Sequence, residues 1–257
     1  MMDTLSLFHL KNKTALITGS GSGIGLALAE GMAGAGAKII LNGRNESKLA
    51  GAEKKLIKNG AAVSKLIFDV TNSDDVKTAI NGYEENQGPI DILVNNAGIN
   101  LRKPFEDFEE KEWKNILDIN INGAMIVSQA VAPFMIGRKA GKIINICSMQ
   151  SELGRPSIVP YAVSKGAIKM LTKALCVEWA KYNIQVNGIG PGYFETELTQ
   201  PLQDDPEFDR WLRNRTPANR WGKPEELIGA AVFLASTAGD YVNGHILYVD
   251  GGLLASV

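Results

Sequence analysis

A glycine-rich turn near the N-terminus constrains the fold of this chain more than any other feature. Residues 13–18 predict a short buried strand, and Gly19-Ser-Gly-Ser-Gly-Ile-Gly25 follows it directly. The next residues carry a helical pattern, which predicts a helix over 24–35. Glycines in this context let the backbone approach a pyrophosphate closely, and the helix N-terminus supplies N–H donors. The arrangement therefore favours dinucleotide binding over a merely flexible loop.

Beyond this turn, apolar runs and helical patterns alternate along the chain. The expected strands are 13–18, 38–42, 63–69, 90–94, 141–147, 184–189 and 245–249. The expected helices are 24–35, 46–59, 73–86, 111–137, 160–181 and 224–235. This alternation predicts an α/β Rossmann fold, a doubly wound parallel sheet of seven strands with helices on both faces. We expect a single domain over residues 1–257, with its ligand at the carboxyl ends of the strands.

The region 190–221 departs from this rhythm. It contains four prolines, together with mixed charges and aromatic residues. A long insertion after the carboxyl end of a strand is commonly a lid or a substrate loop. We therefore expect this region to be a mobile substrate lid.

Composition excludes several classes of protein. The 257 residues are 45% hydrophobic with a net charge of −1, which indicates a soluble chain and gives no support for nucleic-acid binding. We see neither 18 consecutive apolar residues nor a basic leader followed by an apolar core, so we expect a cytoplasmic protein without membrane association. Cys147 and Cys176 lie in apolar runs and predict reduced core thiols. Only two histidines are present, so no metal site is expected.

A tyrosine and a lysine stand four positions apart, at Tyr161 and Lys165, shortly after Ser148. On a helix this spacing puts the phenol and the ammonium on the same face. A nearby positive charge favours the phenolate, so the tyrosine could exchange protons nearer neutral pH than its reference pKa of ~10. Ser148 ends the apolar run 141–147, at a strand end that we expect to face a cleft. Tyr-x-x-x-Lys alone also occurs on solvated helices, and it gains weight from the glycine turn.

The full set of motifs resembles the short-chain dehydrogenase/reductase family. The matching stretches are Thr18-Gly19-x-x-x-Gly23-Ile24-Gly25, Asn95-Asn-Ala-Gly98, Asn120, Ser148, Tyr161 with Lys165, and Pro191-Gly192. They occur in the family's order over essentially the whole chain. The resemblance implies an oxidoreductase that transfers hydride between a nicotinamide cofactor and a carbonyl or alcohol.

Residue roles follow from this resemblance. Tyr161 would be the general acid in reduction, and Lys165 would bind the nicotinamide ribose and lower the pKa of the tyrosine. Ser148 would orient and polarise the substrate oxygen, and Asn120 would hold a water that relays protons to the lysine. The implied cofactor-binding residues are Gly19, Ser22, Gly23, Ile24, Gly25, Arg44, Asp69, Val70, Asn95, Ala97, Gly98, Tyr161, Lys165, Pro191, Gly192 and Thr196. Among them, Asp69 would contact adenine and Asn95 the adenosine ribose.

The residues after the second expected strand favour the phosphorylated cofactor, NADP(H). Members of the family that use NAD usually carry an aspartate eighteen residues after Gly25, but this chain has Gly43 there, followed by Arg44. A guanidinium can bind a 2′-phosphate in a forked, charge-assisted pair, whereas a carboxylate would repel it. Ser22 argues the other way, because many NADP-using relatives carry a basic residue at that position.

Polar and cationic segments near the catalytic residues favour a hydroxyl-rich acid as the substrate. We expect Arg102 and Arg155 to meet the carboxylate or hydroxyls, and Gln150 and Glu152 to bind other hydroxyls, around Ser148 and Tyr161. Longer segments, including 102–108, 143–152, 188–198 and 215–222, resemble a branch of the family that acts on keto-sugar acids. The resemblance implies reversible reduction of 5-keto-D-gluconate to D-gluconate with NADPH.

Three alternatives remain open at this point. A different keto-sugar acid, such as a 3-deoxy-hexulosonate, could occupy nearly the same pocket. A 3-oxoacyl thioester reductase would share every catalytic motif. A cofactor-binding sensor without turnover would need no proton donor, so the set of Asn120, Ser148, Tyr161 and Lys165 argues against it.

The helical patterns over 111–137 and 160–181 carry apolar residues on more than one face. One face can cover the sheet, and the other can be buried against a second copy of the chain. Members of the family commonly pair through these helices. We therefore expect a homotetramer, with burial inside the monomer as the alternative.

Overall fold

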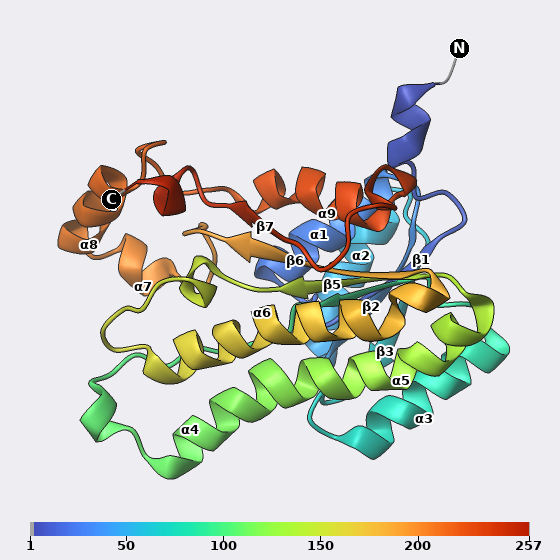
Figure 1. Ribbon diagram of the computed structural model, residues 1–257, viewed down its shortest axis with the longest axis horizontal. Coiled ribbons are helices and arrows are strands. Elements are labelled where there is room, and N and C mark those ends of the chain that lie inside the picture. The colour runs from blue at the N-terminus through green and yellow to red at the C-terminus, as the bar shows by residue number, and fades with distance from the viewer. Residues whose placement is uncertain (1–2, 257) are drawn as a thin grey trace.

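The computed structural model describes residues 3–256 and is built around one parallel sheet (Figure 1). Its seven strands lie in the order β3-β2-β1-β4-β5-β6-β7. They are β1 (Thr14–Ile17), β2 (Lys38–Gly43), β3 (Val63–Ile67), β4 (Ile92–Asn95), β5 (Gly141–Ile146), β6 (Ile184–Pro191) and β7 (Ile246–Val249). Every neighbouring pair of strands is parallel. The predicted fold class is confirmed, and each expected strand is present.

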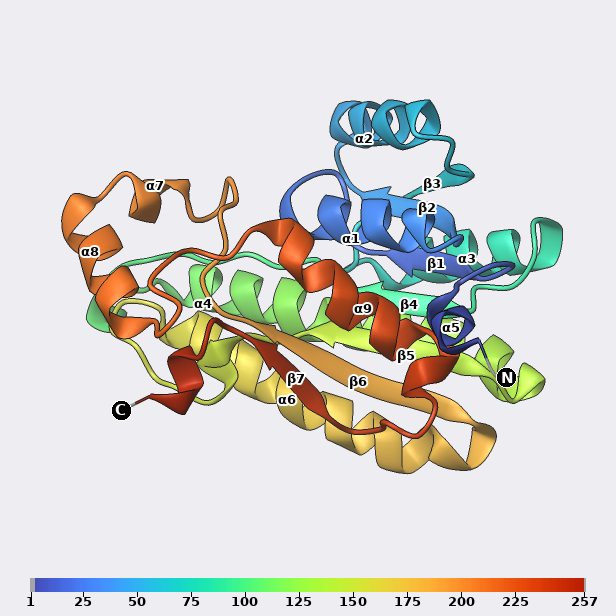
Figure 2. The same cartoon turned by 90° about the horizontal axis from the view of Figure 1, so that it is seen from above.

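Helices cover both faces of this sheet (Figures 1 and 2). They are α1 (Gly23–Gly34), α2 (Glu46–Lys58), α3 (Ser73–Asn86), α4 (Glu110–Leu117), α5 (Gly123–Arg138), α6 (Val159–Trp179), α7 (Gln200–Gln203), α8 (Pro206–Arg215) and α9 (Ile228–Ala235). One apolar cluster joins the sheet to α1, α2 and α9, and a second joins it to α3, α5 and α6. Because both faces are covered, the strands read as nearly continuous apolar runs.

The strand order reverses at β1. This strand pairs with β2 on one side and with β4 on the other, through Ile17↔Leu41 and Ile17↔Val94. After β1 the chain passes to one face of the sheet, and after β4 it passes to the other face. A crevice therefore opens between the carboxyl ends of β1 and β4. The glycine-rich turn after β1 and the segment after β4 both begin there.

Two short helices, α7 and α8, lie in the region predicted as a proline-rich lid. Pro201 and Pro206 stand in the first turns of these helices, where a missing N–H costs nothing. Asp205 caps α8 by accepting hydrogen bonds from the backbone N–H groups of Glu207 and Phe208, at 3.0 and 3.2 Å. The prolines therefore begin regular structure, and the cap followed by proline was a readable signal for it.

The helix expected over 111–137 is interrupted. Between α4 and α5 the residues Asp118–Asn122 form a π-helical turn, in which the N–H of Gly123 donates to the carbonyl of Asp118. By length and composition alone, the combined run Glu110–Arg138 could cross a membrane. In the fold, however, it packs along α3 and α6 as a core helix. The extra residue of the π turn sets the direction in which Asn120 points.

Candidate active site

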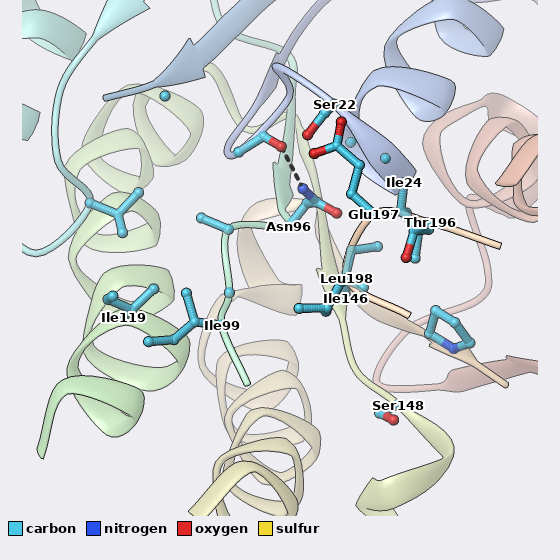
Figure 3. A pocket seen from close by; sticks show the side chains of 18 of the residues that line it. Ser22, Ile24, Asn96, Ile99, Ile119, Ile146, Ser148, Thr196, Glu197 and Leu198 are labelled. Atoms are coloured by element: carbon cyan, nitrogen blue, oxygen red, sulfur yellow. Dashed lines mark hydrogen bonds between the residues drawn. The ribbon is translucent and has the colours of Figure 1, made fainter. Parts of the chain in front are cut away.

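A cavity of about 590 Å³ opens at the carboxyl ends of the strands (Figure 3). That volume lies within the range typical of small-molecule and cofactor sites. Fifteen of the sixteen predicted cofactor-binding residues line it, namely Gly19, Ser22, Gly23, Ile24, Gly25, Arg44, Asp69, Val70, Ala97, Gly98, Tyr161, Lys165, Pro191, Gly192 and Thr196. Ser148 lines it as well. Segments far apart in the sequence therefore meet around one space.

The glycine-rich turn has the backbone shape that phosphate binding requires. Gly19 and Gly23 adopt left-handed conformations, with φ of 62° and 55°, which side chains rarely tolerate. A Cβ on Gly25 would stand only 2.5 Å from the carbonyl oxygen of Gly19. Ser22 precedes α1 without a side-chain cap on its backbone N–H groups. This turn can therefore hold a pyrophosphate against the start of α1.

The segment after β4 is fastened to the same turn. The hydroxyl of Thr18 accepts hydrogen bonds from the backbone N–H groups of Asn96 and Ala97, at 2.9 and 3.0 Å. The amide of Asn96 donates to the carbonyl oxygens of Thr18 and Gly19, at 2.9 and 3.1 Å. Asn96, labelled in Figure 3, lines the cavity. It was not among the predicted residues.

Asn95, which we predicted beside the adenosine ribose, does not line the cavity. Its amide donates to the hydroxyl of Ser128 and to Oδ1 of Asn145, both at 2.9 Å. Asn95 is the last residue of β4, and successive side chains of a strand point to opposite faces. Its side chain is thus turned into the core under α5, and Asn96, the next residue, lines the cavity.

Arg44 and Asp69 form an ion pair at the end of the cavity where we predicted the adenosine. Nη1 of Arg44 lies 3.1 Å from Oδ2 of Asp69. Burial by itself would raise the pKa of the Asp69 carboxyl, but hydrogen bonds from Thr71 and Arg44 together hold it below its ordinary value. The carboxylate therefore stays charged and orients the guanidinium toward the rim of the cavity.

At the opposite end, the predicted catalytic residues come together. Tyr161 and Lys165 lie one turn apart on α6, with the lysine Nζ 5.6 Å from the centroid of the tyrosine ring. Nζ also donates to the carbonyl of Ile146 at 2.7 Å, so the ammonium is tied to the end of β5. Ser148 follows β5 and faces the same space. A carbonyl oxygen placed here would be within reach of both hydroxyls.

The protonation equilibria of this pair differ from the prediction in one respect. Burial lowers the pKa of Lys165 to about 8. Burial also raises the pKa of Tyr161, and the groups that oppose this rise are the Ser148 hydroxyl and the Arg102 guanidinium. The expected lowering of the tyrosine pKa by Lys165 is therefore not seen. Ser148 and Arg102 favour the phenolate in its place.

Asn120 holds the surrounding backbone in position. Its Oδ1 accepts from the N–H of Ile99 at 2.8 Å, and its Nδ2 donates to the carbonyl of Ile99 and the hydroxyl of Ser164, both at 3.0 Å. The side chain thus connects the segment after β4 to α6, one turn from Tyr161. It does not line the cavity itself, and the relayed water remains a prediction.

A smaller cavity of about 70 Å³ adjoins the main one, and we call it the annex. Ser148 and Tyr161 line both spaces. The annex is also lined by Asn100, Arg102, Met149, Gln150, Ile158, Gly192, Tyr193, Leu198 and Thr199. Within the described residues, the side-chain oxygens of Asn100 and Gln150 are buried without a hydrogen-bond partner. Buried polar atoms in this condition are costly and indicate a place where a ligand can supply donors.

Two of the predicted substrate residues lie outside both cavities. Oε1 of Glu152 accepts from Nζ of Lys169 at 2.5 Å and from the Tyr248 hydroxyl at 2.6 Å. The guanidinium of Arg155 stacks on the rings of Phe208 and Trp211, 4.4 and 4.7 Å from their centroids. The prediction of direct substrate contacts by Glu152 and Arg155 is corrected accordingly. Arg155 instead joins the segment after Ser148 to helix α8.

Asn100 is the functional candidate that sequence reasoning missed. It stands two residues before Arg102, in the same polar segment after Asn95-Asn-Ala-Gly98. In the sequence it could not be distinguished from an ordinary asparagine of a loop. The cavity forms only where Tyr193 and Leu198, which are remote in sequence, line it together with Asn100.

Comparisons with known proteins agree with this geometry. A family model described as enoyl-(acyl carrier protein) reductase matches residues 19–254. The 5-keto-D-gluconate 5-reductase of Escherichia coli strain K12 is 55% identical over 253 residues, covering 98% of this chain and 99% of that protein. The 2-dehydro-3-deoxy-D-gluconate 5-dehydrogenase of Formosa agariphila is 50% identical, covering 99% and 97%. A solved gluconate 5-dehydrogenase from Burkholderia cenocepacia J2315, in complex with NADP and tartrate, superimposes with a TM-score of 0.96 at 55% identity, covering 98% and 99%. This chain belongs to the short-chain dehydrogenase/reductase family.

Proposed function

We propose that this protein is an NADP-dependent oxidoreductase that reversibly transfers hydride between NADPH and the C5 carbonyl of 5-keto-D-gluconate, giving D-gluconate. The observation that carries the proposal is the junction of the two cavities. Ser148 and Tyr161 line both of them, so a group in the annex meets a ligand of the main cavity at these two hydroxyls. Relatives at 50–55% identity are named for reactions at C5 of sugar acids.

The residues present fit a dinucleotide phosphate. The glycine turn would hold the pyrophosphate, Arg44 the 2′-phosphate, and Lys165 the hydroxyls of the nicotinamide ribose. A bound nicotinamide supplies the hydride, and the protein supplies orientation and electrostatics. The solved gluconate 5-dehydrogenase in complex with NADP supports the same cofactor.

The chain's own groups handle the proton. In the reductive direction the Tyr161 hydroxyl donates a proton to the C5 oxygen, while the Ser148 hydroxyl donates a hydrogen bond to the same atom and holds it in place. Because burial disfavours the phenolate, the tyrosine needs the Ser148 hydrogen bond and the Arg102 charge to release its proton. Lys165 is the group through which the phenol would be reprotonated.

Arg102 is the cation of the annex, and a sugar-acid carboxylate is its natural partner. Asn100 and Gln150 would accept hydrogen bonds from hydroxyls, which satisfies the two buried oxygens. An acyl chain would offer no hydrogen-bond or charge partner to Arg102, Asn100 or Gln150. This lining therefore favours a sugar acid over a 3-oxoacyl thioester.

A second sugar acid, 2-dehydro-3-deoxy-D-gluconate, is the competing substrate. A relative named for it is 50% identical to this chain over nearly the whole length. Compared with gluconate, this substrate lacks the hydroxyls at C2 and C3, so it offers fewer donors to the two annex amides. We therefore place it second.

Initial rates in both directions decide between these substrates. NADPH oxidation is followed with 5-keto-D-gluconate and with an acetoacetyl thioester, and NADP⁺ reduction is followed with D-gluconate and with 2-dehydro-3-deoxy-D-gluconate, which carries a hydroxyl at C5. Each assay is repeated with the unphosphorylated cofactor. We expect the highest kcat/KM for 5-keto-D-gluconate with NADPH. Turnover of the deoxy acid alone would keep the chemistry and reassign the substrate, and turnover of the thioester alone would overturn the annex argument.

We further propose a cytoplasmic homotetramer with a mobile lid over 190–221. Exposed apolar side chains on the outer helices support the assembly, among them Met125 on α5 and Val163, Met170 and Val177 on α6. Sedimentation velocity at micromolar concentration tests the tetramer, and limited proteolysis within 190–221, with and without NADPH, tests the lid.

A further inference from the structure

The 2′-phosphate end of the main cavity is short of positive charge. A phosphate monoester carries roughly −1.5 to −2 at neutral pH. Arg44 is the cation that lines this part of the cavity, and Asp69 already pairs with it at 3.1 Å. Ser22 adds no charge from the glycine turn. One guanidinium shared with a carboxylate leaves most of the phosphate charge unbalanced.

Lys48 stands beside this gap. It is the third residue of α2, and Arg44 lies just before that helix. A Cβ built on Gly21 would be 3.3 Å from the Cβ of Lys48, so the lysine lies against the glycine turn. Its side chain remains about half exposed.

The lysine ammonium reaches the cavity through its ion-pair partner. Nζ of Lys48 is 3.2 Å from Oε2 of Glu197, and Glu197 lines the cavity. Figure 3 shows the Glu197 carboxylate beside Ser22, at the glycine turn. An acidic side chain of the lid thus stands where an anionic ligand is expected, with a mobile cation attached to it.

We propose that Lys48 is the second cation for the 2′-phosphate and that Glu197 holds it in place until the cofactor binds. The proposal rests on the proposed use of NADP. On binding, Lys48 exchanges a carboxylate for a phosphate, and the released Glu197 carboxylate, 73% exposed, is solvated by water. An exposed pair of this kind is weak and screened by salt, which makes the exchange easy. The freed carboxylate is repelled by the phosphates and leaves with the lid segment.

Equilibrium binding of two small ligands tests the role of Lys48 without turnover. Isothermal titration compares adenosine 2′,5′-bisphosphate with 5′-AMP for the wild type, Lys48→Gln and Lys54→Gln. Lys54 is an exposed lysine of the same helix and serves as the matched control. Loss of one charge-assisted contact should weaken the bisphosphate by about ten-fold in Lys48→Gln alone and leave 5′-AMP unchanged.

A double-mutant cycle tests the role of Glu197. Glu197→Gln should tighten the bisphosphate about two- to three-fold in the wild-type background and have no effect when Lys48 is already glutamine. Equal effects in both backgrounds would overturn the exchange.

The remaining outcomes separate this inference from the proposed function. If Lys48→Gln behaves like Lys54→Gln while the wild type still prefers the bisphosphate, the Lys48 assignment fails and NADP stands. If the wild type binds both ligands equally, the 2′-phosphate site itself is wrong, and the inference fails with it.

Discussion

The two ends of the main cavity handle charge in opposite ways. At the adenosine end, the side chains of Arg44 and Lys48 are 65% and 55% exposed, and each pairs with an acidic partner in solvent. At the catalytic end, Lys165 is 5% exposed and burial lowers its pKa to about 8. Solvent screens the first pair of charges, so they can be exchanged at little cost. Burial makes the second charge sensitive to pH, which is what proton transfer requires.

Removing the phenolic hydroxyl should have the largest effect at the buried end. Tyr161→Phe should lower kcat by about 10³-fold, because the proton donor is lost, while NADPH binding changes little. Stopped-flow turnover and fluorescence titration of NADPH measure the two quantities separately. If kcat survives, the catalytic end has been assigned to the wrong residue. Ser148→Ala is the companion variant, and its loss should be smaller because the hydroxyl of Ser148 positions the oxygen and assists the tyrosine but does not itself transfer the proton.

The annex should be the next most sensitive region. Arg102→Ala should raise the KM for 5-keto-D-gluconate by roughly 30- to 100-fold, the size expected for a charge-assisted hydrogen bond. Arg102→Lys keeps the charge without the fork and should recover part of this loss. An unchanged KM in the alanine variant would show that another group binds the carboxylate.

Substitutions at the exposed end should have smaller effects, and these effects should weaken as the ionic strength is raised. Arg44→Gln should raise the KM for NADPH by about ten-fold at low salt and leave the KM for NADH nearly unchanged. The difference between the two cofactors should shrink as salt is raised from 50 to 500 mM, because the guanidinium is solvated. Steady-state kinetics with both cofactors supplies the measurement, and an equal loss for NADPH and NADH would contradict 2′-phosphate recognition by Arg44.

The smallest effect concerns stability and pH. Lys165 has a pKa of about 8 in the folded chain against 10.5 as its ordinary value. Between pH 8 and pH 10.5 the Lys165 side chain is protonated in the unfolded chain but mostly neutral in the folded chain. The free energy of unfolding therefore rises with pH in this range. From pH 7 to 9 the wild type should gain about 1 kcal/mol relative to Lys165→Met. Urea unfolding of both proteins at the two pH values checks this. A difference that does not change with pH would mean that the ammonium keeps its ordinary pKa.

The sheet could be predicted from the sequence because its strands are simple. Runs such as 141–147 and 184–189 are buried on both faces, so their composition alone marks them. The glycine turn and the tyrosine–lysine pair were readable for a related reason, since each depends on spacing within one local element. Together with the residues implied by the family resemblance, fifteen of the sixteen predicted cofactor residues line one cavity.

The errors arose where side-chain direction depends on distant partners. Asn95 and Asn96 are neighbours of the same type, and only the pairing of Asn95 with Asn145 shows which one faces the core. Arg155 carries the same charge as Arg102, but it stacks on the aromatic rings of Phe208 and Trp211 in α8 and does not line the annex. The π-helical turn likewise depends on Asn120 meeting Ile99 and Ser164, which are remote in sequence.

The π-helical turn at Asp118–Asn122 also makes the length of this helical run critical. Deleting one residue there would restore an ordinary helix with better backbone geometry. Every later residue would then rotate by about 100°, and the stripe of α5 that contains Val127, Val131 and Met135 would turn away from the sheet. A surface loop absorbs such a deletion, but this helix cannot. The π-helical turn thus lets Asn120 meet the segments around the catalytic centre while the residues of α5 after it still face the core.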